Sequence, residues 1–98
     1  MTDFSNYETA CVASFIEDNV NYYNSVNRTI SDLIPYWSIG DITSILSSSL
    51  RDICEYDFTE SAKEASSLAR TLLFNSLGCI NFNELAVLFI NRYLSSSH

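Results

Sequence analysis

Apolar residues recur at every third or fourth position along almost the whole chain. No long stretch alternates apolar and polar residues with a period of two, which is the pattern of a half-buried strand. The sequence therefore predicts an all-α protein.

A first helix is expected from about Asn6 to Tyr23. Ser5 and Glu8 stand three positions apart, the spacing of a capping box at a helix start. Its expected apolar face consists of Cys11, Val12, Phe15, Ile16, Val20 and Tyr23.

Four asparagines and one serine lie between positions 19 and 27. Such side chains compete with the helical backbone for hydrogen bonds, so we expect a break or a weak helix there. The alternative is one long helix from Asn6 to Ile34. Pro35 ends the element in either case, because the residue before a proline avoids helical geometry.

Ser38 is expected to cap the next helix, which carries Ile39, Ile42, Ile45, Leu46, Leu50, Ile53 and Cys54. Asp57–Glu60 is predicted to be the following boundary, with Asp57 or Thr59 as the cap. A fourth helix then carries Ala62, Ala65, Leu68, Ala69, Leu72, Leu73 and Leu77, and Gly78 is predicted at its C′ position with a positive φ.

Asn81 is expected to cap the last helix, with Glu84 at the capping-box position. This helix is apolar nearly all round, which is typical of a central helix or an interface helix. Its apolar residues are Phe82, Leu85, Val87, Leu88, Phe89, Ile90 and Tyr93. The prediction is a single domain over residues 1–98, a bundle of four to five short helices with a frayed tail at 95–98.

Composition adds charge to this picture. The 98 residues are 47% hydrophobic, enough for a core, and 12 acids against 5 bases give a formal net charge of −7. That charge repels phosphate backbones and attracts basic partners, so we expect a basic protein as partner and no direct binding of nucleic acid. The alternative is that the charge serves only solubility.

Residues that carry chemistry are sparse. The one histidine is the last residue, and neither a CxxC pair nor a glycine-rich phosphate loop occurs, so we expect no enzyme, no metal and no cofactor. An odd number of cysteines predicts free thiols in a reducing compartment, with Cys11 and Cys54 in the core and Cys79 more exposed. The first residues lack an export segment and no apolar run approaches about 20 residues, which predicts a cytoplasmic protein without a membrane span.

The most informative feature is a cluster of acids from position 52 to 64, which we call the acidic corner. Five acids against Lys63, interleaved with aromatic side chains, are typical of a binding surface. The predicted partner-binding residues are Asp52, Glu55, Tyr56, Asp57, Glu60 and Glu64. The alternative is that these acids only cap the fourth helix and favour its dipole.

The leading functional prediction is an acidic inhibitor that neutralises a basic target protein, and small size and acidity are the general profile of an immunity protein that blocks a nuclease-type toxin. One alternative is a phage-type nucleic-acid mimic that inhibits a host defence enzyme. The other is a homo-oligomeric structural or assembly module, with a homodimer formed through the last helix.

Overall fold

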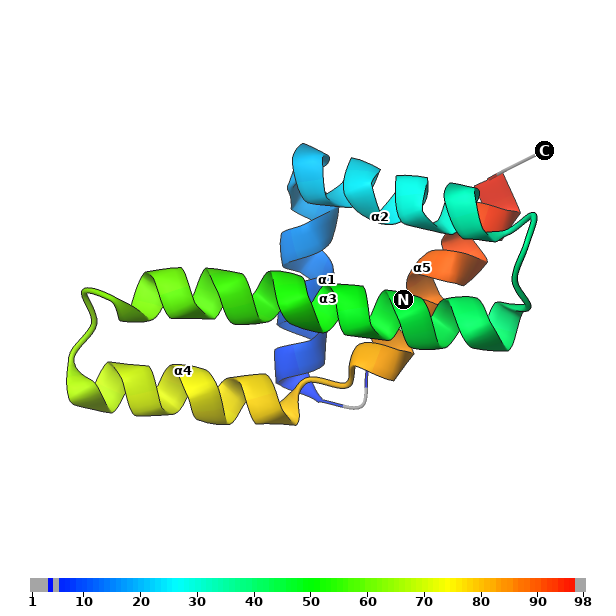
Figure 1. The fold of residues 1–98 in the computed structure, drawn as a ribbon. Coiled ribbons are helices and arrows are strands. Elements are labelled where there is room, and N and C mark those ends of the chain that lie inside the picture. The colour runs from blue at the N-terminus through cyan, green and yellow to red at the C-terminus, as the bar shows by residue number, and fades with distance from the viewer. Residues whose placement is uncertain (1–3, 5, 97–98) are drawn as a thin grey trace.

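Five helices make up the computed structural model, which describes residue 4 and residues 6–96 (Figure 1). They are α1 (Tyr7–Asp18), α2 (Val20–Leu33), α3 (Ile39–Ala62), α4 (Ser67–Cys79) and α5 (Phe82–Ser96). The described residues contain no strand, so the predicted all-α bundle of short helices is confirmed, with five helices.

Asparagine caps determine the first two helices. Asn6 caps α1, with its side-chain oxygen accepting a hydrogen bond from the Thr9 amide at 2.8 Å. Ser5, which was predicted for that role, lies outside the described residues. Asn19 has an extended backbone and caps α2 in the same way, so the predicted break is confirmed and one long helix from 6 to 34 is wrong. The first helix ends at Asp18 and not near Tyr23, which belongs to α2.

The boundary predicted at Asp57–Glu60 is wrong. Helix α3 continues through this segment to Ala62, and Ser66 caps α4 by accepting a hydrogen bond from the Ala69 amide. Residues with polar side chains that suit a cap are also compatible with a helix interior, and no glycine or proline stands between 57 and 66 to force an end. Asp57 is therefore a helical residue and not part of a turn.

Two further boundaries differ from the prediction. Gly78 lies inside α4 and no glycine has a positive φ, so its predicted role at C′ is wrong. Helix α5 extends through Ser95 and Ser96, the first two residues of the segment predicted to fray, while 97 and 98 lie outside the described residues.

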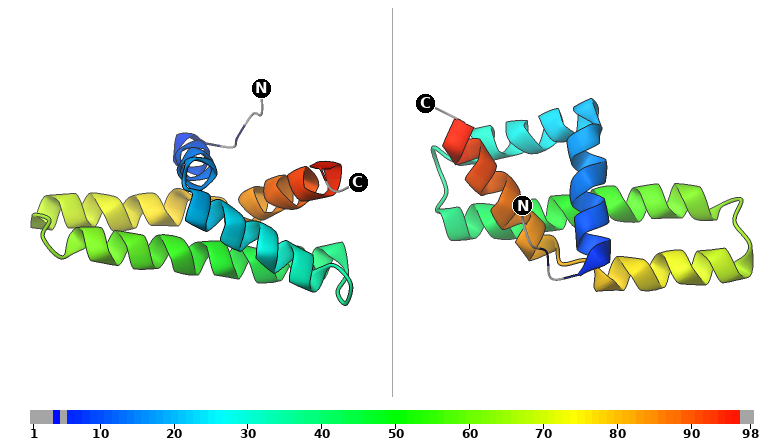
Figure 2. Two further views of the ribbon diagram at one scale, coloured as in Figure 1. Left: turned by 90° about the horizontal axis from the view of Figure 1, so that it is seen from above. Right: turned by 180° about the vertical axis from the view of Figure 1, so that it is seen from behind.

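Helix α3 is the long central element, and α1 and α5 cross the same side of it (Figure 2). The core row of α3 has a residue every four positions, which keeps it on one face. That row belongs to one buried cluster with side chains of α1, α2 and α5. The buried core consists of Val12, Ala13, Ile16, Val26, Ile30, Ile42, Leu46, Leu50, Cys54, Ile80, Phe82, Leu85, Ala86, Phe89 and Ile90.

The C-terminal part of α3, from Glu55 onward, and all of α4 form an antiparallel hairpin that projects from this core (Figure 1). We call residues 55–79 the arm and the remaining helices, with α3 up to Cys54, the body. The arm lies along the longest dimension of the molecule, 47 Å against 26 and 23 Å for the other two. None of the residues of α4 is buried.

Candidate functional site: an acidic, apolar pocket at the base of the arm

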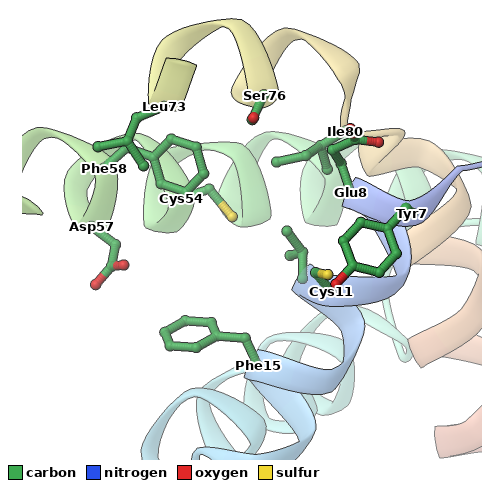
Figure 3. A pocket seen from close by; sticks show the side chains of 11 residues that line it. Tyr7, Glu8, Cys11, Phe15, Cys54, Asp57, Phe58, Leu73, Ser76 and Ile80 are labelled. Carbon is green, nitrogen blue, oxygen red and sulfur yellow. The ribbon is translucent and has the colours of Figure 1, made fainter. Parts of the chain in front are cut away.

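A pocket of about 400 Å³ opens in the angle between α1, α3 and α4 (Figure 3). Its volume lies within the range of small-molecule and side-chain binding pockets, about 300–1,000 Å³. It is lined by Tyr7, Glu8, Cys11, Val12, Phe15, Cys54, Asp57, Phe58, Leu73, Ser76 and Ile80.

One edge of α1 supplies the wall that faces the arm. Tyr7, Cys11 and Phe15 follow each other at intervals of four, so they lie in a row along this helix. The row lies beside the face that α1 packs into the core, and its three residues line the pocket (Figure 3). The Phe15 ring also contacts the Tyr22 ring of α2, with centroids 5.5 Å apart, which supports this wall from behind.

The walls opposite α1 come from the arm and from the last residue of the body part of α3. Cys54, Asp57 and Phe58 stand on one face of α3, and Leu73 and Ser76 stand on the adjacent face of α4. The pocket therefore exists only while α1 is docked beside the α3–α4 hairpin.

Two hydrogen bonds of very long sequence separation hold α1 in that place. The backbone N–H of Asn81 donates to Thr9 Oγ1 at 2.9 Å, and the side-chain Nδ2 of Asn6 donates to the backbone carbonyl oxygen of Cys79 at 2.7 Å. Thr9 is fully buried, so its hydroxyl and the Asn81 amide satisfy each other. We call these two bonds the latch, because they join the start of α1 to the corner between α4 and α5.

The charged groups that line the pocket are both acids. Glu8 and Asp57 are half-buried carboxylates, and no lysine, arginine or histidine is among the lining residues. Neither acid takes part in an ion pair with another residue that the structure describes. An apolar cavity with uncompensated carboxylates favours a ligand that combines an apolar group with a positive charge.

The two pocket thiols differ in their surroundings. Burial, and to a smaller extent the nearby Asp57 carboxylate, raises the pKa of the Cys54 thiol to about 11, so this thiol stays neutral near pH 7. Cys11 is exposed to the pocket, and its hydrogen bond with Tyr7 raises the pKa of the Tyr7 hydroxyl. The prediction that Cys54 lies in the core is confirmed and the same prediction for Cys11 is wrong, whereas Cys79 is exposed as predicted.

The structure spreads the predicted acidic corner over several surfaces. Asp57 alone faces the pocket. Asp52, Tyr56 and Glu60 succeed each other at intervals of four on the outer face of α3, and all three are exposed. Glu64 is exposed in the turn between α3 and α4.

Bases compensate two acids of the corner. Glu60 Oε2 lies 2.5 Å from Lys63 Nζ, and this contact lowers the pKa of the Glu60 carboxyl. Tyr56 donates its hydroxyl to Glu60 Oε1 at 3.2 Å, and the adjacent carboxylate raises the pKa of that hydroxyl. Glu55 Oε1 lies 3.6 Å from Arg51 Nε. The outer face of α3 is therefore less negative than the acid count suggests.

Sequence reasoning missed the contributions of α1 and α4 to the pocket. A signal was present, because the apolar stripe of α1 is wider than one buried row requires: Cys11 and Phe15 flank Val12 and Ile16. The extra row is the wall of the pocket. Which helix it faces depends on the tertiary packing and cannot be read from the spacing.

Neither a metal centre nor a single spanning helix is found in the part of the chain that the structure describes. Its His, Cys, Asp and Glu side chains form no group of three or more that could hold a metal ion. None of its helices is by itself long and apolar enough to cross a membrane. Helices α4 and α5 together, bent by 60°, meet that test by length and composition only, and the buried core helix of a folded protein also meets it.

Comparisons with protein-family models, with curated proteins and with solved structures gave no match to this chain.

Proposed function

We propose that this chain is a protein-binding inhibitor that captures a basic segment of its target in the pocket between α1, α3 and α4. The observation that carries the proposal is the make-up of this pocket: apolar walls, two half-buried carboxylates and no cation among the lining residues. The proposal is one of binding and not of catalysis.

Binding would proceed in two steps. The net charge of −7 raises the rate of encounter with a basic surface, an effect that salt weakens. An apolar side chain of the target then enters between Phe15, Phe58 and Leu73, where it is removed from water. A lysine or arginine next to it on the target pairs with Glu8 or Asp57, which selects basic partners.

We expect the remaining acids of the acidic corner to act through long-range electrostatic attraction of the basic target. Asp52 and Glu60 lie on the outer face of α3, where contacts with a partner would stay in water and contribute little to affinity. The central anchor is the pocket, and the outer acids mainly raise the association rate.

Nuclease-type toxins are a target class of suitable chemistry, because an enzyme that binds phosphate backbones presents a basic cleft. In that case the chain acts as an immunity protein. A nucleic-acid mimic instead needs a long row of uncompensated carboxylates, and the pairs Arg51–Glu55 and Lys63–Glu60 interrupt such a row along α3. The geometry therefore favours the pocket over mimicry.

A first test uses a model helix with leucines on one face and lysines on the other, together with the same helix in which glutamates replace the lysines. We expect the lysine helix to bind and the glutamate helix not to bind. The double substitution Glu8→Gln and Asp57→Asn should weaken binding roughly fivefold, since two partly exposed ion pairs are lost at about 0.5 kcal/mol each. The control is Asp41→Asn with Asp52→Asn, which removes the same charge from exposed positions outside the pocket.

The rate at which the Cys11 thiol is labelled can report whether the pocket is occupied. Cys11 is exposed to the pocket, Cys79 is exposed outside it, and Cys54 is buried. Bound lysine helix, or a basic target protein recovered from the source cells, should slow maleimide labelling of Cys11 relative to the free chain at equal concentration and leave Cys79 unaffected. Unchanged labelling of Cys11, or equal weakening by the control pair, would overturn the proposal.

A further inference from the structure

Helix α4 presents to water an unpartnered seam that is apolar except at Asn75. Leu68 and Leu72 are 71% and 57% exposed, and Asn75 and Cys79 continue the same line. The intervals of four, three and four residues are those at which two helices pair along a common seam. Exposing leucines in this arrangement is costly for a free helix and indicates an interaction surface.

Charge distinguishes this surface from the other helices. Helix α4 contains no Asp or Glu, and its one charged residue is Arg70. Each of the other four helices carries at least one acid: Glu8 in α1, Asp32 in α2, Asp41 in α3 and Glu84 in α5. In a chain with a net charge of −7, α4 is the helix that carries no negative charge.

We propose that the seam of α4 pairs with the same seam of a second copy, forming a two-fold dimer. Two chains of charge −7 repel each other on most faces, and the acid-free helix is where they can meet without opposing carboxylates. The basic partner of the pocket gains no charge pairing from this face. We therefore assign the seam to the second copy of the chain and the pocket to the basic partner.

The shape of the molecule selects an antiparallel pairing. Helix α4 runs from the free tip of the arm back to the body (Figure 1). Parallel arms would bring the two acidic bodies to the same end, whereas antiparallel arms place them at opposite ends. Leu72 then lies next to Asn75 of the second copy, and Leu68 lies next to its Cys79.

The oligomeric state tests the proposal on the full chain. We expect the mass measured by light scattering to rise with concentration from 11.1 kDa to twice that value. Salt should strengthen this association by screening the repulsion between the bodies, whereas it should weaken binding of the basic partner. The opposite effects of salt keep a failure of the dimer distinguishable from a failure of the proposed function.

Leu72→Asp should weaken dimerisation by about tenfold or more, because the change occurs twice in a symmetric interface. Leu72 is largely exposed, so helicity measured by circular dichroism should be retained. The matched control is Val87→Asp, which alters a 41% exposed residue on α5 and should leave the mass unchanged. A monomer at all concentrations, or a dimer that Leu72→Asp does not weaken, would overturn the proposal.

A crosslink tests the direction of pairing. In a chain with Cys11→Ser, adding Leu68→Cys should allow oxidation to a covalent dimer through Cys79 of the second copy. Without Leu68→Cys, two Cys79 residues in an antiparallel pair are displaced by eleven helical residues, roughly 16 Å, too far for a disulfide. A covalent dimer that forms equally without Leu68→Cys would overturn the antiparallel arrangement.

Discussion

Helices α4 and α5 are similar in composition and opposite in environment. More than half of the residues in each are apolar. Helix α5 buries Phe82, Leu85, Ala86, Phe89 and Ile90, and it makes the most extensive contact of any helix with α3. Helix α4 contacts α3 and α1 but buries none of its residues.

The difference shows that apolar content determines whether a helix needs a partner, and the tertiary arrangement determines whether this chain supplies one. Helix α5 crosses α3 where α2 and α1 also converge, so its side chains are surrounded. Helix α4 packs beside the end of α3 that no other helix reaches (Figure 1). Its remaining apolar surface is free for the pocket and for the seam.

The largest expected effect comes from a matched pair of leucine truncations. Leu85→Ala removes a fully buried side chain and should lower the free energy of unfolding by about 2 to 5 kcal/mol. Leu72→Ala removes a side chain that is mostly in water and should change the free energy of unfolding by less than about 0.5 kcal/mol at concentrations where the chain is monomeric. Chemical denaturation measures both values, and equal losses would show that α4 is packed as tightly as α5.

The second prediction, of intermediate size, concerns how the free energy of unfolding depends on pH through Cys54, the last residue of the body before the arm. Cys54 is the last residue of the four-residue core row of α3, and its pKa is raised from 9.0 to about 11. Below pH 9 the thiol is protonated in both states, whereas between pH 9 and 11 it ionises only in the unfolded chain. The free energy of unfolding should therefore fall by roughly 2 to 3 kcal/mol across this range.

The measurement is denaturation at a series of pH values, with Cys54→Ala as the comparison. That variant should be less stable at pH 7 and should show a smaller decline between pH 9 and 11. An identical decline in both proteins would mean that other groups, such as the tyrosines, account for it.

The smallest expected effect compares two helix caps. Asn19 in the body and Ser66 in the arm each accept a hydrogen bond of 3.2 Å from a backbone amide three residues on. Asn19→Ala should lower global stability by about 1 kcal/mol. Ser66→Ala should instead speed hydrogen exchange of the α4 amides with less change in global stability, because an arm with few buried contacts opens locally.

Hydrogen exchange followed by mass spectrometry distinguishes the two variants. If Ser66→Ala accelerated exchange across the whole chain and not mainly in α4, the arm and the body would unfold as one unit. The contrast between α4 and α5 would then concern exposure alone.

The sequence was sufficient for the features that depend on local chemistry. Pro35 follows the end of α2, Ser38 caps α3 and Asn81 accepts a hydrogen bond from the Glu84 amide, all as their types and positions predict. The boundary between α3 and α4 was misplaced because Asp57 and Thr59 have the side chains of a cap, whereas Ser66 is the residue whose backbone is extended.

The candidate site was predictable only in part for a different reason. Asp57 was selected from the density of acids around it, and it lines the pocket. Its companion Glu8 lies 49 positions earlier and becomes a neighbour only because α1 folds back against the arm. Helical spacing assigns each residue to a face of its own helix and leaves open which faces meet.

The latch has a consequence for the order of folding. Thr9 and Asn81 are 72 positions apart, and Asn6 and Cys79 are 73 apart, so both bonds close a loop of most of the chain. Contacts of such separation carry a large chain entropy cost and form after the local ones. We therefore expect the first helix to dock on α4 and α5 late in folding, so that the binding pocket, which needs that helix as a wall, is completed in a late step.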